Sequence, residues 1–345
     1  MSNHLEKDKI PVVGGFKVYS GKLLMETEPE PLEWLVKGLI PKGAKTILAG
    51  ETGSNKSFWC LQLALSLASG KDKFLGYSIP EPARVLYLNT EGSRDSVHRR
   101  VRWICEALDI SDLSLFKLTG ERTRYDDLWT TSSIRKLLEK YEPELLIIDN
   151  AYSSTTKDVS KNDVVRGFTS RLDQLKENFG LTLLLVCHFN KGTYDQGLIL
   201  DRTSGASALL NWLECGILLI KSRHPDYPDL RLMKLAKMRD EQDNSDIWGL
   251  EWDVEKKVLH KIGIIKDEKA HLSSLQKAGF RYDALKMMNE EFETSDWVKV
   301  VVEAENEPRI VSRATAHNWL NRLVQDGFIE KTHQGVYRKK GLTVI

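Results

Sequence analysis

The chain has 345 residues, of which 41% are hydrophobic and 29% charged, an ordinary globular composition that excludes a collagen-like or disordered protein. This length is enough for about two domains at roughly 150 residues each. Fifty Lys and Arg residues against 49 Asp and Glu residues give a formal net charge of +1. A near-neutral total argues against a surface uniformly coated in positive charge for nucleic acid.

The cysteines lie far apart in apolar segments and form no Cys-x-x-Cys pair or Cys/His cluster. We expect buried, reduced thiols at Cys60, Cys105, Cys187 and Cys215 rather than metal ligands. The first ten residues lack an apolar signal region, and no apolar run approaches the roughly 18 residues that span a bilayer. The sequence therefore predicts a cytoplasmic protein with no membrane partner.

Residues 1–30 are polar and end in Glu-Pro-Glu-Pro, which predicts a loosely held N-terminal arm. From Trp34, apolar runs of strand length alternate with amphipathic stretches of helical length. The predicted strands are 45–50, 84–89, 144–149, 181–188 and 215–221, with more alternating strands at 231–238 and 247–253. The predicted helices are 56–69, one from about 93, 126–141, and one from Ser160, with capping-box spacing to Asp163, that ends before Gly180. This alternation predicts an α/β domain with a largely parallel sheet over residues 31–263.

The pattern changes near residue 264, where a charged and weakly periodic stretch predicts a linker helix within 264–290. Beyond it we expect helices at 296–303 and 313–326, separated by a break at 306–308. Two short strands follow, around a turn at Gln334 and Gly335. This order of elements is that of a small winged helix-turn-helix domain, which we place at 291–345.

The sequence Gly-Glu-Thr-Gly-Ser-Asn-Lys-Ser at 50–57 lies between a predicted strand and a predicted helix. Such a loop turns backbone N–H groups toward a phosphate, with Lys56 reaching the β- and γ-phosphates and Ser57 the Mg²⁺ ion. Asn55 stands where the GxxxxGK[ST] pattern has glycine; Asn tolerates positive φ, so the loop can form, and strain there would weaken nucleotide affinity. The alternative is a chance Gly/Ser turn. The predicted nucleotide-binding residues are Gly50, Glu51, Thr52, Gly53, Ser54, Asn55, Lys56, Ser57 and Phe58.

Two carboxylates follow predicted strands. Asp149 ends the strand 144–149, where a second magnesium-organising group belongs, so Ser57 and Asp149 are the predicted metal residues. Glu91 follows the strand 84–89, where a carboxylate can act as a base or position water. The alternatives are that Asp149 is a helix cap or a solvated loop residue and that Glu91 caps the helix beginning at Ser93.

Several short motifs occur together in one order: 48–70, 74–76, 85–93 followed by an Arg-rich helix, 145–150, 183–192 and 201–212. Together they resemble RecA-like P-loop ATPases. Within that group, the chain is most similar to the RepA-type plasmid hexameric replicative helicases and their phage and mobile-element relatives. The resemblance covers about residues 30–262.

The resemblance implies roles for particular residues, with ATP and Mg²⁺ as cofactors. Lys56 and Ser57 match the phosphate lysine and the magnesium hydroxyl, Asp149 the magnesium-organising acid and Glu91 the catalytic glutamate. His188 matches the residue that senses the γ-phosphate and passes its state to the DNA-binding loops; alone, it would be taken for a structural histidine.

Lys237 and Arg239 resemble the Lys-x-Arg element that ring ATPases insert into a neighbour's active site. An arginine finger of this kind can be worth about 10³ to 10⁵ in rate. The alternative is two solvated strand charges. If the finger is real, the active site lies between subunits, and a monomer hydrolyses ATP poorly.

Two groups of residues are candidate nucleic-acid contacts. In a RecA-like ring the segments 151–163 and 190–207 would face the channel and hold a single strand. Their predicted contacts are Lys157, Lys161, Lys191 and Arg202; the alternative is ordinary surface loops. In the C-terminal domain the predicted contacts are Arg313, His317, Asn318, Arg322, Arg338, Lys339 and Lys340; the alternative there is protein contact.

The net charge is unevenly distributed. Residues 309–345 hold seven Lys or Arg and two Asp or Glu residues, a net charge of +5, which leaves −4 for the first 308 residues. The charge distribution marks the C-terminal end as a candidate nucleic-acid contact, and the resemblance implies the activity. Together they lead us to expect an ATP-hydrolysing, ring-forming DNA motor, a homo-oligomer and specifically a hexamer, that acts as the replicative helicase of a plasmid or mobile element. The alternatives are a recombinase or helicase loader, and an ATP-responsive DNA-binding regulator.

Overall fold

The computed structural model describes residues 11–120, 132–151, 161–190, 196–203, 206–224, 227–239, 246–266, 268–272, 284–303 and 312–340. The chain divides into two units, residues 1–33 and 34–345. In the first unit, β1 (Val12–Val13) pairs antiparallel with β2 (Phe16–Lys17), and the short helix α1 (Gly21–Glu26) follows. No residue of α1 is buried, so this unit has no core of its own among its described residues.

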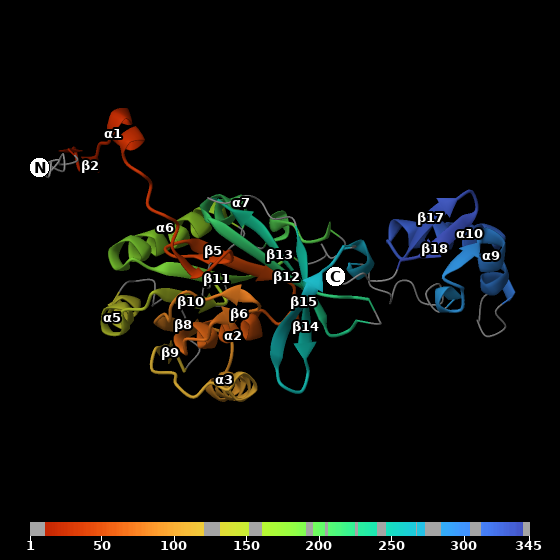
Figure 1. Ribbon diagram of the computed structural model, residues 1–345, viewed down its shortest axis with the longest axis horizontal. Helices are drawn as coiled ribbons and strands as arrows, with labels where there is room; N and C mark the ends of the chain where they lie inside the picture. Colours follow the sequence, from red (N-terminus) through yellow and green to blue (C-terminus); the bar gives the residue numbers. More distant parts are fainter. Residues whose placement is uncertain are drawn as a thin grey trace, which may run out of the picture. The chain divides into compact units, whose positions relative to one another are not determined.

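The second unit is built on a nine-stranded sheet with the order β15-β14-β13-β12-β5-β11-β10-β8-β9 (Figure 1). The strands from β12 to β9 run parallel, whereas β13, β14 and β15 form an antiparallel edge. In chain order the strands are β5 (Lys45–Gly50), β8 (Val85–Asn89), β9 (Phe116–Leu118), β10 (Leu145–Asp149), β11 (Thr182–His188), β12 (Cys215–Lys221), β13 (Leu230–Met238), β14 (Ile247–Asp253) and β15 (Val258–Ile264). The predicted α/β fold with a largely parallel sheet is confirmed.

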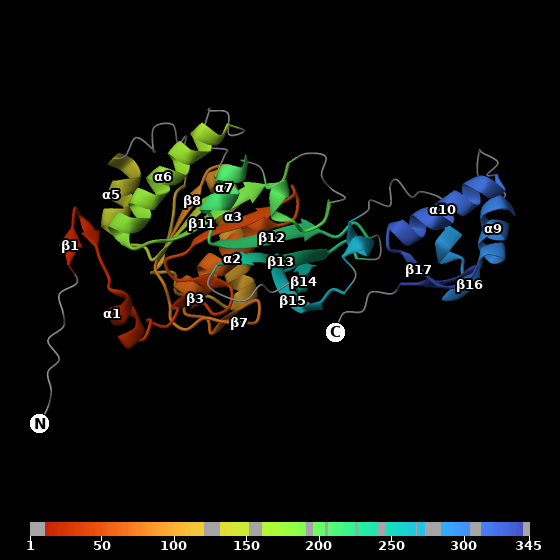
Figure 2. The ribbon, with the colours of Figure 1, turned by 90° about the horizontal axis from the view of Figure 1, so that it is seen from above.

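Helices cover both faces of this sheet (Figure 2). On one face lie α2 (Lys56–Ala68) and α3 (Arg94–Leu108), and on the other α5 (Ser132–Tyr141), α6 (Asn162–Phe179) and α7 (Ala206–Trp212). Successive strand residues alternate between the two cores, so Leu48 packs under α2 whereas Ile47 faces the opposite layer. Burial on both faces explains why these strands have continuous apolar runs.

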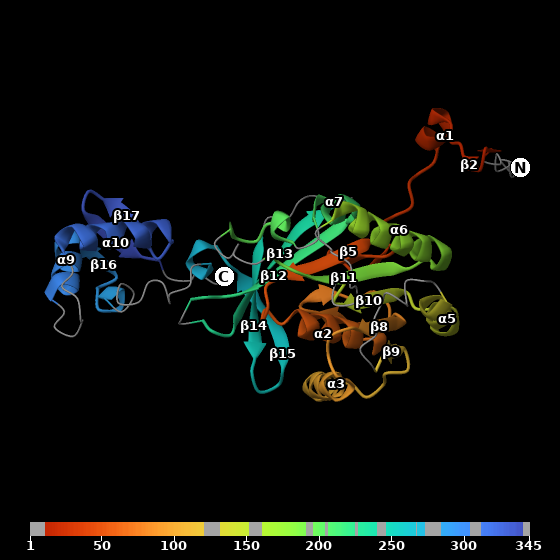
Figure 3. The ribbon, with the colours of Figure 1, turned by 180° about the vertical axis from the view of Figure 1, so that it is seen from behind.

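Two strands of the nine-stranded sheet were not predicted from the sequence. β9 has three half-buried residues, too few to stand out from a loop. β15 has the sequence Val-Leu-His-Lys-Ile-Gly-Ile, which lacks both a continuous apolar run and a regular alternation. It is held against α2 by Gln62, whose amide nitrogen donates to the carbonyl of Leu259 (3.0 Å) and whose amide oxygen accepts from the N–H of Leu259 (2.9 Å). Figure 3 shows β14 and β15 beside α2 from behind.

The ends of two helices differ in how they are capped. α3 begins after Ser93, whose hydroxyl accepts from the N–H of Ser96 (3.3 Å). α6 begins at Asn162, and its N-cap residue Lys161 makes no side-chain cap bond. The capping box predicted at Ser160 and Asp163 includes Ser160, which lies outside the described residues. Gly180, with φ of 66°, ends α6 as predicted.

A separate small core lies near the C-terminus. There β16 (Glu291–Glu293), β18 (Val336–Lys339) and β17 (Ile329–His333) form a three-stranded sheet in that order, with α9 (Thr294–Glu303) and α10 (Arg313–Gln325) packed against it. Trp297 is fully buried in this core, and its indole N–H donates to the carbonyl of Ala316 (2.8 Å). The two helices and the hairpin lie where the sequence predicted them, whereas β16 was not predicted.

The linker helix predicted within 264–290 is not formed at residues 264–272. There β15 runs to Ile264, and a single 3₁₀ turn, η3 (Lys269–His271), follows. The charged residues of this stretch suggested a solvated helix, but His271 is instead completely buried. Among the described residues no helix is long and apolar enough to cross a membrane.

The buried imidazole of His271 generates a prediction about acid stability. Its Nδ1 lies 2.7 Å from the Ser222 hydroxyl, and burial lowers its pKa from 6.5 to about 4. A base with a lowered folded-state pKa contributes stability above its unfolded-state pKa, and this contribution is lost as the pH falls toward the folded-state value. We expect a loss of about 2 kcal/mol between pH 7 and pH 5 from this group, measured by urea unfolding.

His271→Gln should remove most of this pH dependence. The matched control is His98→Gln, at an exposed position on α3, which should retain the dependence of the wild type. A His271→Gln protein that keeps the full acid sensitivity would contradict the assignment.

Candidate functional site

The carboxyl ends of four neighbouring parallel strands bring the predicted site residues together. His188 at the end of β11 is level with Gly50 at the end of β5, and Asp149 at the end of β10 is level with Asn89 of β8. Loops that leave these ends therefore start from one edge of the sheet. In open α/β sheets, this edge is where ligands bind.

The loop between β5 and α2 has a fixed backbone. A Cβ atom on Gly50 would lie 2.0 Å from the carbonyl oxygen of Leu219, so only glycine fits there. Gly53 has φ of +84°, and the hydroxyl of Ser54 donates to the carbonyl of Glu51 (2.9 Å). Asn55 adopts φ of 68° and ψ of 26°, the left-handed conformation that the sequence requires at this position.

Lys56 occupies the first position of α2 and is only 6% exposed. Its ammonium group donates to the carbonyls of Gly50 (2.9 Å) and Glu51 (2.8 Å), and it lies 3.3 Å from Nδ1 of His188. Burial lowers the pKa of Lys56, and the nearby Asp149 carboxylate acts in the opposite direction. The ammonium is thus held at the mouth of the loop, where a phosphate would meet it.

Asp149 is buried beneath this loop. Its Oδ2 accepts a hydrogen bond from the Tyr87 hydroxyl (2.5 Å), and its carboxylate also takes one from the Ser57 side chain. Burial raises the pKa of Asp149, whereas these two hydrogen bonds lower it. Asp149 is therefore neither a helix cap nor a solvated loop residue.

The oxygen atoms of Ser57 and Asp149 suit a magnesium ion. Mg²⁺ prefers oxygen ligands and is bound by one or two protein groups together with substrate phosphates and water. In the described part of the chain no three His, Cys, Asp or Glu residues cluster as a metal cage. A hydroxyl and a carboxylate beside a phosphate-binding loop thus fit Mg²⁺ held with a nucleotide.

Glu91 and His188 lie on the other side of Lys56. One carboxylate oxygen of Glu91 accepts from the side-chain amide of Asn150 (2.6 Å) and lies 3.8 Å from Nε2 of His188. Since Ser93 caps α3, the alternative role of Glu91 as that cap is wrong. His188 contacts Lys56 through one ring nitrogen and approaches Glu91 through the other, so it links the phosphate lysine to the predicted catalytic glutamate.

Lys237 and Arg239 do not join this cluster within one chain. Lys237 on β13 pairs with Gly216 on β12, three residues, or about 10 Å, from Leu219, which is level with Gly50. The ammonium group of Lys237 donates to the carbonyl of Leu210 (3.1 Å). Arg239 pairs with Glu214 (3.7 Å). Both side chains lie where the parallel strands begin, whereas the phosphate loop lies where these strands end.

The sequence did not predict that Lys221, Arg223 and Arg231 contact the phosphate loop. Oε2 of Glu51 accepts from Arg223 (3.0 Å), and its Oε1 accepts from the N–H of Lys221 (3.0 Å). Arg231 donates through Nε to the side-chain oxygen of Asn55 (2.8 Å). These partners are 170 to 176 residues apart in the sequence, so no local pattern reveals them. The Phe58 ring, predicted to contact nucleotide, packs edge-on against Trp252 at 4.7 Å between ring centroids.

The predicted single-strand contacts are placed unevenly. Lys157 and Lys191 lie outside the described residues, and Lys161 is exposed before α6. Arg202 is only 1% exposed: its guanidinium lies 4.2 Å from the centroid of the Phe189 ring and donates to the carbonyl of Gly197. The prediction of Arg202 as a phosphate contact is therefore wrong. Its neighbours in the sequence are polar, which suggested an exposed position.

The predicted contacts near the C-terminus lie on α10 and the β17–β18 hairpin. Arg313, His317, Asn318 and Arg322 are exposed on α10, on the side away from its buried residues. On the hairpin, Arg338 pairs with Glu291 (3.2 Å), and Lys339 donates to the carbonyl of Met288 (2.6 Å). Lys340 is exposed.

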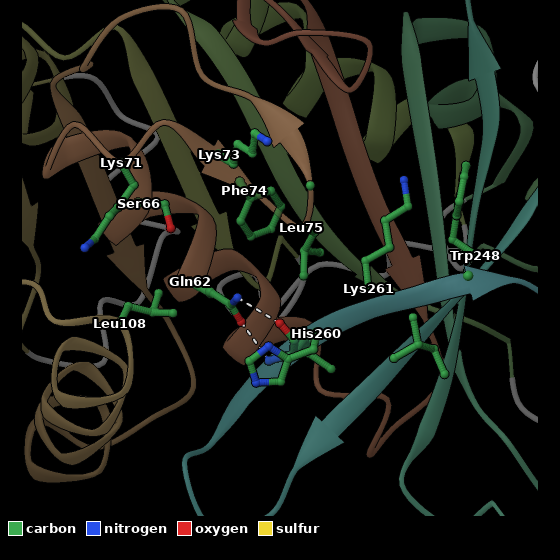
Figure 4. A pocket seen from close by; sticks show the side chains of 14 residues that line it. Gln62, Ser66, Lys71, Lys73, Phe74, Leu75, Leu108, Trp248, His260 and Lys261 are labelled. Carbon is green, nitrogen blue, oxygen red and sulfur yellow. Dashed lines mark hydrogen bonds between the residues drawn. The ribbon is translucent and has the colours of Figure 1, made fainter. Parts of the chain in front are cut away.

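A separate cavity of about 620 Å³ lies between α2, the hairpin of β6 (Lys73–Phe74) and β7 (Tyr77–Ser78), and the antiparallel edge strands (Figure 4). Gln62, Phe74, Trp248 and Lys261 are among its lining residues, and none of the predicted nucleotide-site residues is. The ammonium of Lys261 lies over the rings of Tyr77 and Trp248, at 4.2 and 3.3 Å from their centroids. This cavity is distinct from the nucleotide site.

Comparisons with known proteins agree with this geometry. Residues 21–194 match a family described as an AAA domain. Among solved structures, the chain resembles that of a KaiC-like protein from the hyperthermophilic archaeon Pyrococcus horikoshii, with a TM-score of 0.50 and 14% identity, over 67% of this chain and 99% of that chain. This likeness shows the fold alone. The comparison with curated proteins finds no match.

The Tyr87 hydroxyl generates a prediction about magnesium. Removing the donor that orients a metal-binding carboxylate typically weakens metal binding about 10- to 100-fold. Tyr87→Phe should therefore raise the Mg²⁺ concentration that half-saturates ATP binding at least about tenfold. Tyr141→Phe, on α5, is the matched control and should leave the Mg²⁺ titration unchanged. Equal titrations for the two variants would show that Tyr87 does not serve the metal.

Proposed function

Because the chain belongs to the AAA-domain family and is a RecA-like P-loop ATPase, we propose that it acts as a ring-forming, ATP-driven DNA motor. More specifically, we propose that it is the replicative helicase of a plasmid or other mobile element. The observation that carries the proposal is the cluster at the carboxyl edge of the sheet, where the Lys56 ammonium, the Ser57–Asp149 pair, Glu91 and His188 lie within one network.

The residues of this network divide the work of hydrolysis. Lys56 and the loop N–H groups hold the phosphates. Ser57 and Asp149 would hold a magnesium ion, which would supply positive charge to the phosphate oxygens. Glu91 orients the attacking water. Its carboxylate is held by Asn150 on the neighbouring strand end, which keeps it above the sheet edge rather than on α3. Electrostatic positioning of this kind is the main source of catalysis in phosphoryl transfer.

His188 connects the nucleotide to the rest of the molecule in this proposal. Its two ring nitrogens lie 3.3 Å from the Lys56 ammonium and 3.8 Å from the Glu91 carboxylate, so a γ-phosphate that engages either group changes the surroundings of the ring. The chain continues directly from β11 into residues 189–203. These contacts support a sensor role for His188 that reaches the proposed single-strand loops.

The position of Lys237 and Arg239 supports an active site shared between subunits. Both lie away from the phosphate loop of their own chain, so a role in hydrolysis requires the loop of a neighbouring copy. In a closed ring each copy would offer its loop to one neighbour and these two side chains to the other. We therefore propose a homo-oligomer, specifically a hexamer.

The small C-terminal domain predicted at 291–345, which contains β16 to β18, α9 and α10, supplies the proposed duplex contact. Its order of two helices followed by a hairpin is that of a winged helix-turn-helix, and α10 takes the place of the recognition helix. Four polar side chains, Arg313, His317, Asn318 and Arg322, project from the exposed side of α10. We propose that this helix face contacts DNA while single-stranded DNA passes through the ring.

ATP hydrolysis and assembly test the proposal together. Native mass measurement of the wild type with ATP and single-stranded DNA should show a hexamer, and DNA should stimulate hydrolysis. Glu91→Gln should lower kcat about 10²- to 10⁴-fold without preventing ATP binding, because it removes the group that orients water. Glu106→Gln, at an exposed position on α3, is the matched control and should hydrolyse ATP like the wild type.

The other outcomes of this experiment discriminate between activities. Filaments in place of closed rings would favour a recombinase or loader. ATP binding without turnover, together with a sequence-specific duplex footprint, would favour a DNA-binding regulator and reject the motor. A persistent monomer with full activity would reject the shared site.

A mixing experiment tests the shared site separately. Arg239→Ala should lower kcat by about 10³-fold or more, and Lys56→Ala should abolish hydrolysis. In the proposed ring the two substitutions remove parts of the site that come from different subunits. Mixed in equal amounts, the two inactive proteins should regain activity, because an intact Arg239 from one subunit meets an intact Lys56 loop in the other. Arg166→Ala, at an exposed position on α6, is the control and should be active alone. No recovery on mixing, with rings formed, would show that Arg239 does not act in trans.

A further inference from the structure

The phosphate loop contains one residue that is conformationally expensive. Asn55 has φ of 68° and ψ of 26°, immediately before Lys56 at the start of α2. For a residue with a Cβ atom the left-handed region costs roughly 1 to 2 kcal/mol relative to the right-handed one, although Asn visits it more readily than most. Glycine, which the GxxxxGK[ST] pattern has at this position, adopts it without that cost.

Asn55 does not use its side chain in the usual way for this position. A helix N-cap asparagine normally has extended backbone angles and accepts a hydrogen bond from an N–H of the first helical turn. Asn55 is the N-cap residue of α2, yet its side chain makes no cap bond. Its oxygen instead accepts from Nε of Arg231 on β13, at 2.8 Å.

Arg231 is itself rigidly placed. It is only 3% exposed, and its NH1 donates to the carbonyls of Pro228 (3.1 Å) and Leu230 (3.2 Å). Burial lowers its pKa from the usual value, opposed by the carboxylates of Asp229 and Glu51. A guanidinium buried and bonded in this way offers a fixed donor to Asn55, and little side-chain entropy remains to be lost when the bond forms.

The other end of the same loop is held by a second arginine. Glu51 accepts from Arg223 and from the N–H of Lys221. Lys221 pairs with Arg231 across β12 and β13. The loop is therefore hydrogen-bonded at two points, at Glu51 by Lys221 and Arg223 and at Asn55 by Arg231. Between these two contacts lie Thr52, Gly53 and Ser54, and Lys56 follows Asn55 directly.

We propose that Arg231 is a positioning residue for the phosphate loop, whose bond to Asn55 replaces the conformational freedom of the missing glycine. The φ of Asn55 sets the direction in which the N–H groups of Lys56 and Ser57 point. Holding Asn55 in the left-handed region therefore keeps these donors aimed at the phosphates. This inference rests on the proposed function for its ATP measurement alone; the hydrogen-exchange measurement does not depend on it.

The proposal is tested by a double-mutant cycle of Arg231→Met and Asn55→Gly, with two readouts. In the Asn55 background, Arg231→Met should weaken ATP affinity about tenfold and, without nucleotide, accelerate amide hydrogen exchange in residues 53–58. In the Asn55→Gly background the same substitution should change both readouts less than about twofold, because glycine adopts the left-handed conformation without strain and has no side chain to bond Arg231. Arg166→Met, an exposed arginine on α6, is the matched control and should change neither readout.

Equal effects of Arg231→Met in both backgrounds would overturn the proposal, because they would show that Arg231 acts through its charge or through the stability of β13. If Arg231→Met does not fold, Arg231→Lys takes its place: it keeps the positive charge but lacks Nε, so the same dependence on Asn55 is expected. If even the wild type binds no ATP, the proposed function fails, and hydrogen exchange alone still decides whether Arg231 holds Asn55.

Discussion

The buried ammonium group of Lys56 is the interaction on which the rest of the site depends. A charge taken out of water must be matched by acceptors, and here they come from distinct parts of the sheet edge. The carbonyls of Gly50 and Glu51 belong to the end of β5 and its loop, and the imidazole of His188 ends the neighbouring strand β11. The register that aligns His188 with Gly50 is therefore also what satisfies the lysine. Asp149 on the next strand adds the compensating negative charge.

The antiparallel edge adds a second function to the same sheet. β13 runs opposite to β12, so Arg231 near the start of β13 reaches the phosphate loop at the carboxyl ends of the parallel strands. Lys237 and Arg239 lie at the other end of β13, where the parallel strands begin. The eight residues from Arg231 to Arg239 correspond to about 26 Å of strand. One strand thus contacts the loop of its own chain at one end and presents the proposed finger at the other. A movement of β13 along its axis would displace both Arg231 at the phosphate loop and the proposed finger residues.

Much of the fold and part of the site could be predicted from local sequence. Strands buried on both faces have continuous apolar runs, and the loop at 50–57 carries its own backbone requirements, so the positions of Lys56, Ser57, Asp149 and Glu91 at one edge could be predicted. His188 could not, because a histidine at a strand end looks structural and only the resemblance to RecA-like ATPases singled it out. The hydrogen bonds of Arg223 and Arg231 to the loop could not be predicted either, because each partner is contributed by the far end of the domain. Arg202 shows the opposite failure: a polar, glycine-containing neighbourhood indicates exposure, but Phe189 and the carbonyl of Gly197 enclose its guanidinium.

The charge of the small C-terminal domain, residues 291–345, needs a narrower interpretation than the +5 of residues 309–345. Counted over 291–345, the domain holds eight Lys or Arg and eight Asp or Glu residues, so its basic half is balanced by an acidic one. The structure shows how the halves meet, because Arg338 of the hairpin pairs with Glu291 of β16. By contrast, Arg313 and Arg322 of α10 make no ion pair with any described residue. Phosphate affinity scales with the number of neutralised contacts, so this domain would bind DNA weakly as a single copy. In the proposed ring, repetition of this domain, rather than the charge of one chain, would supply the affinity.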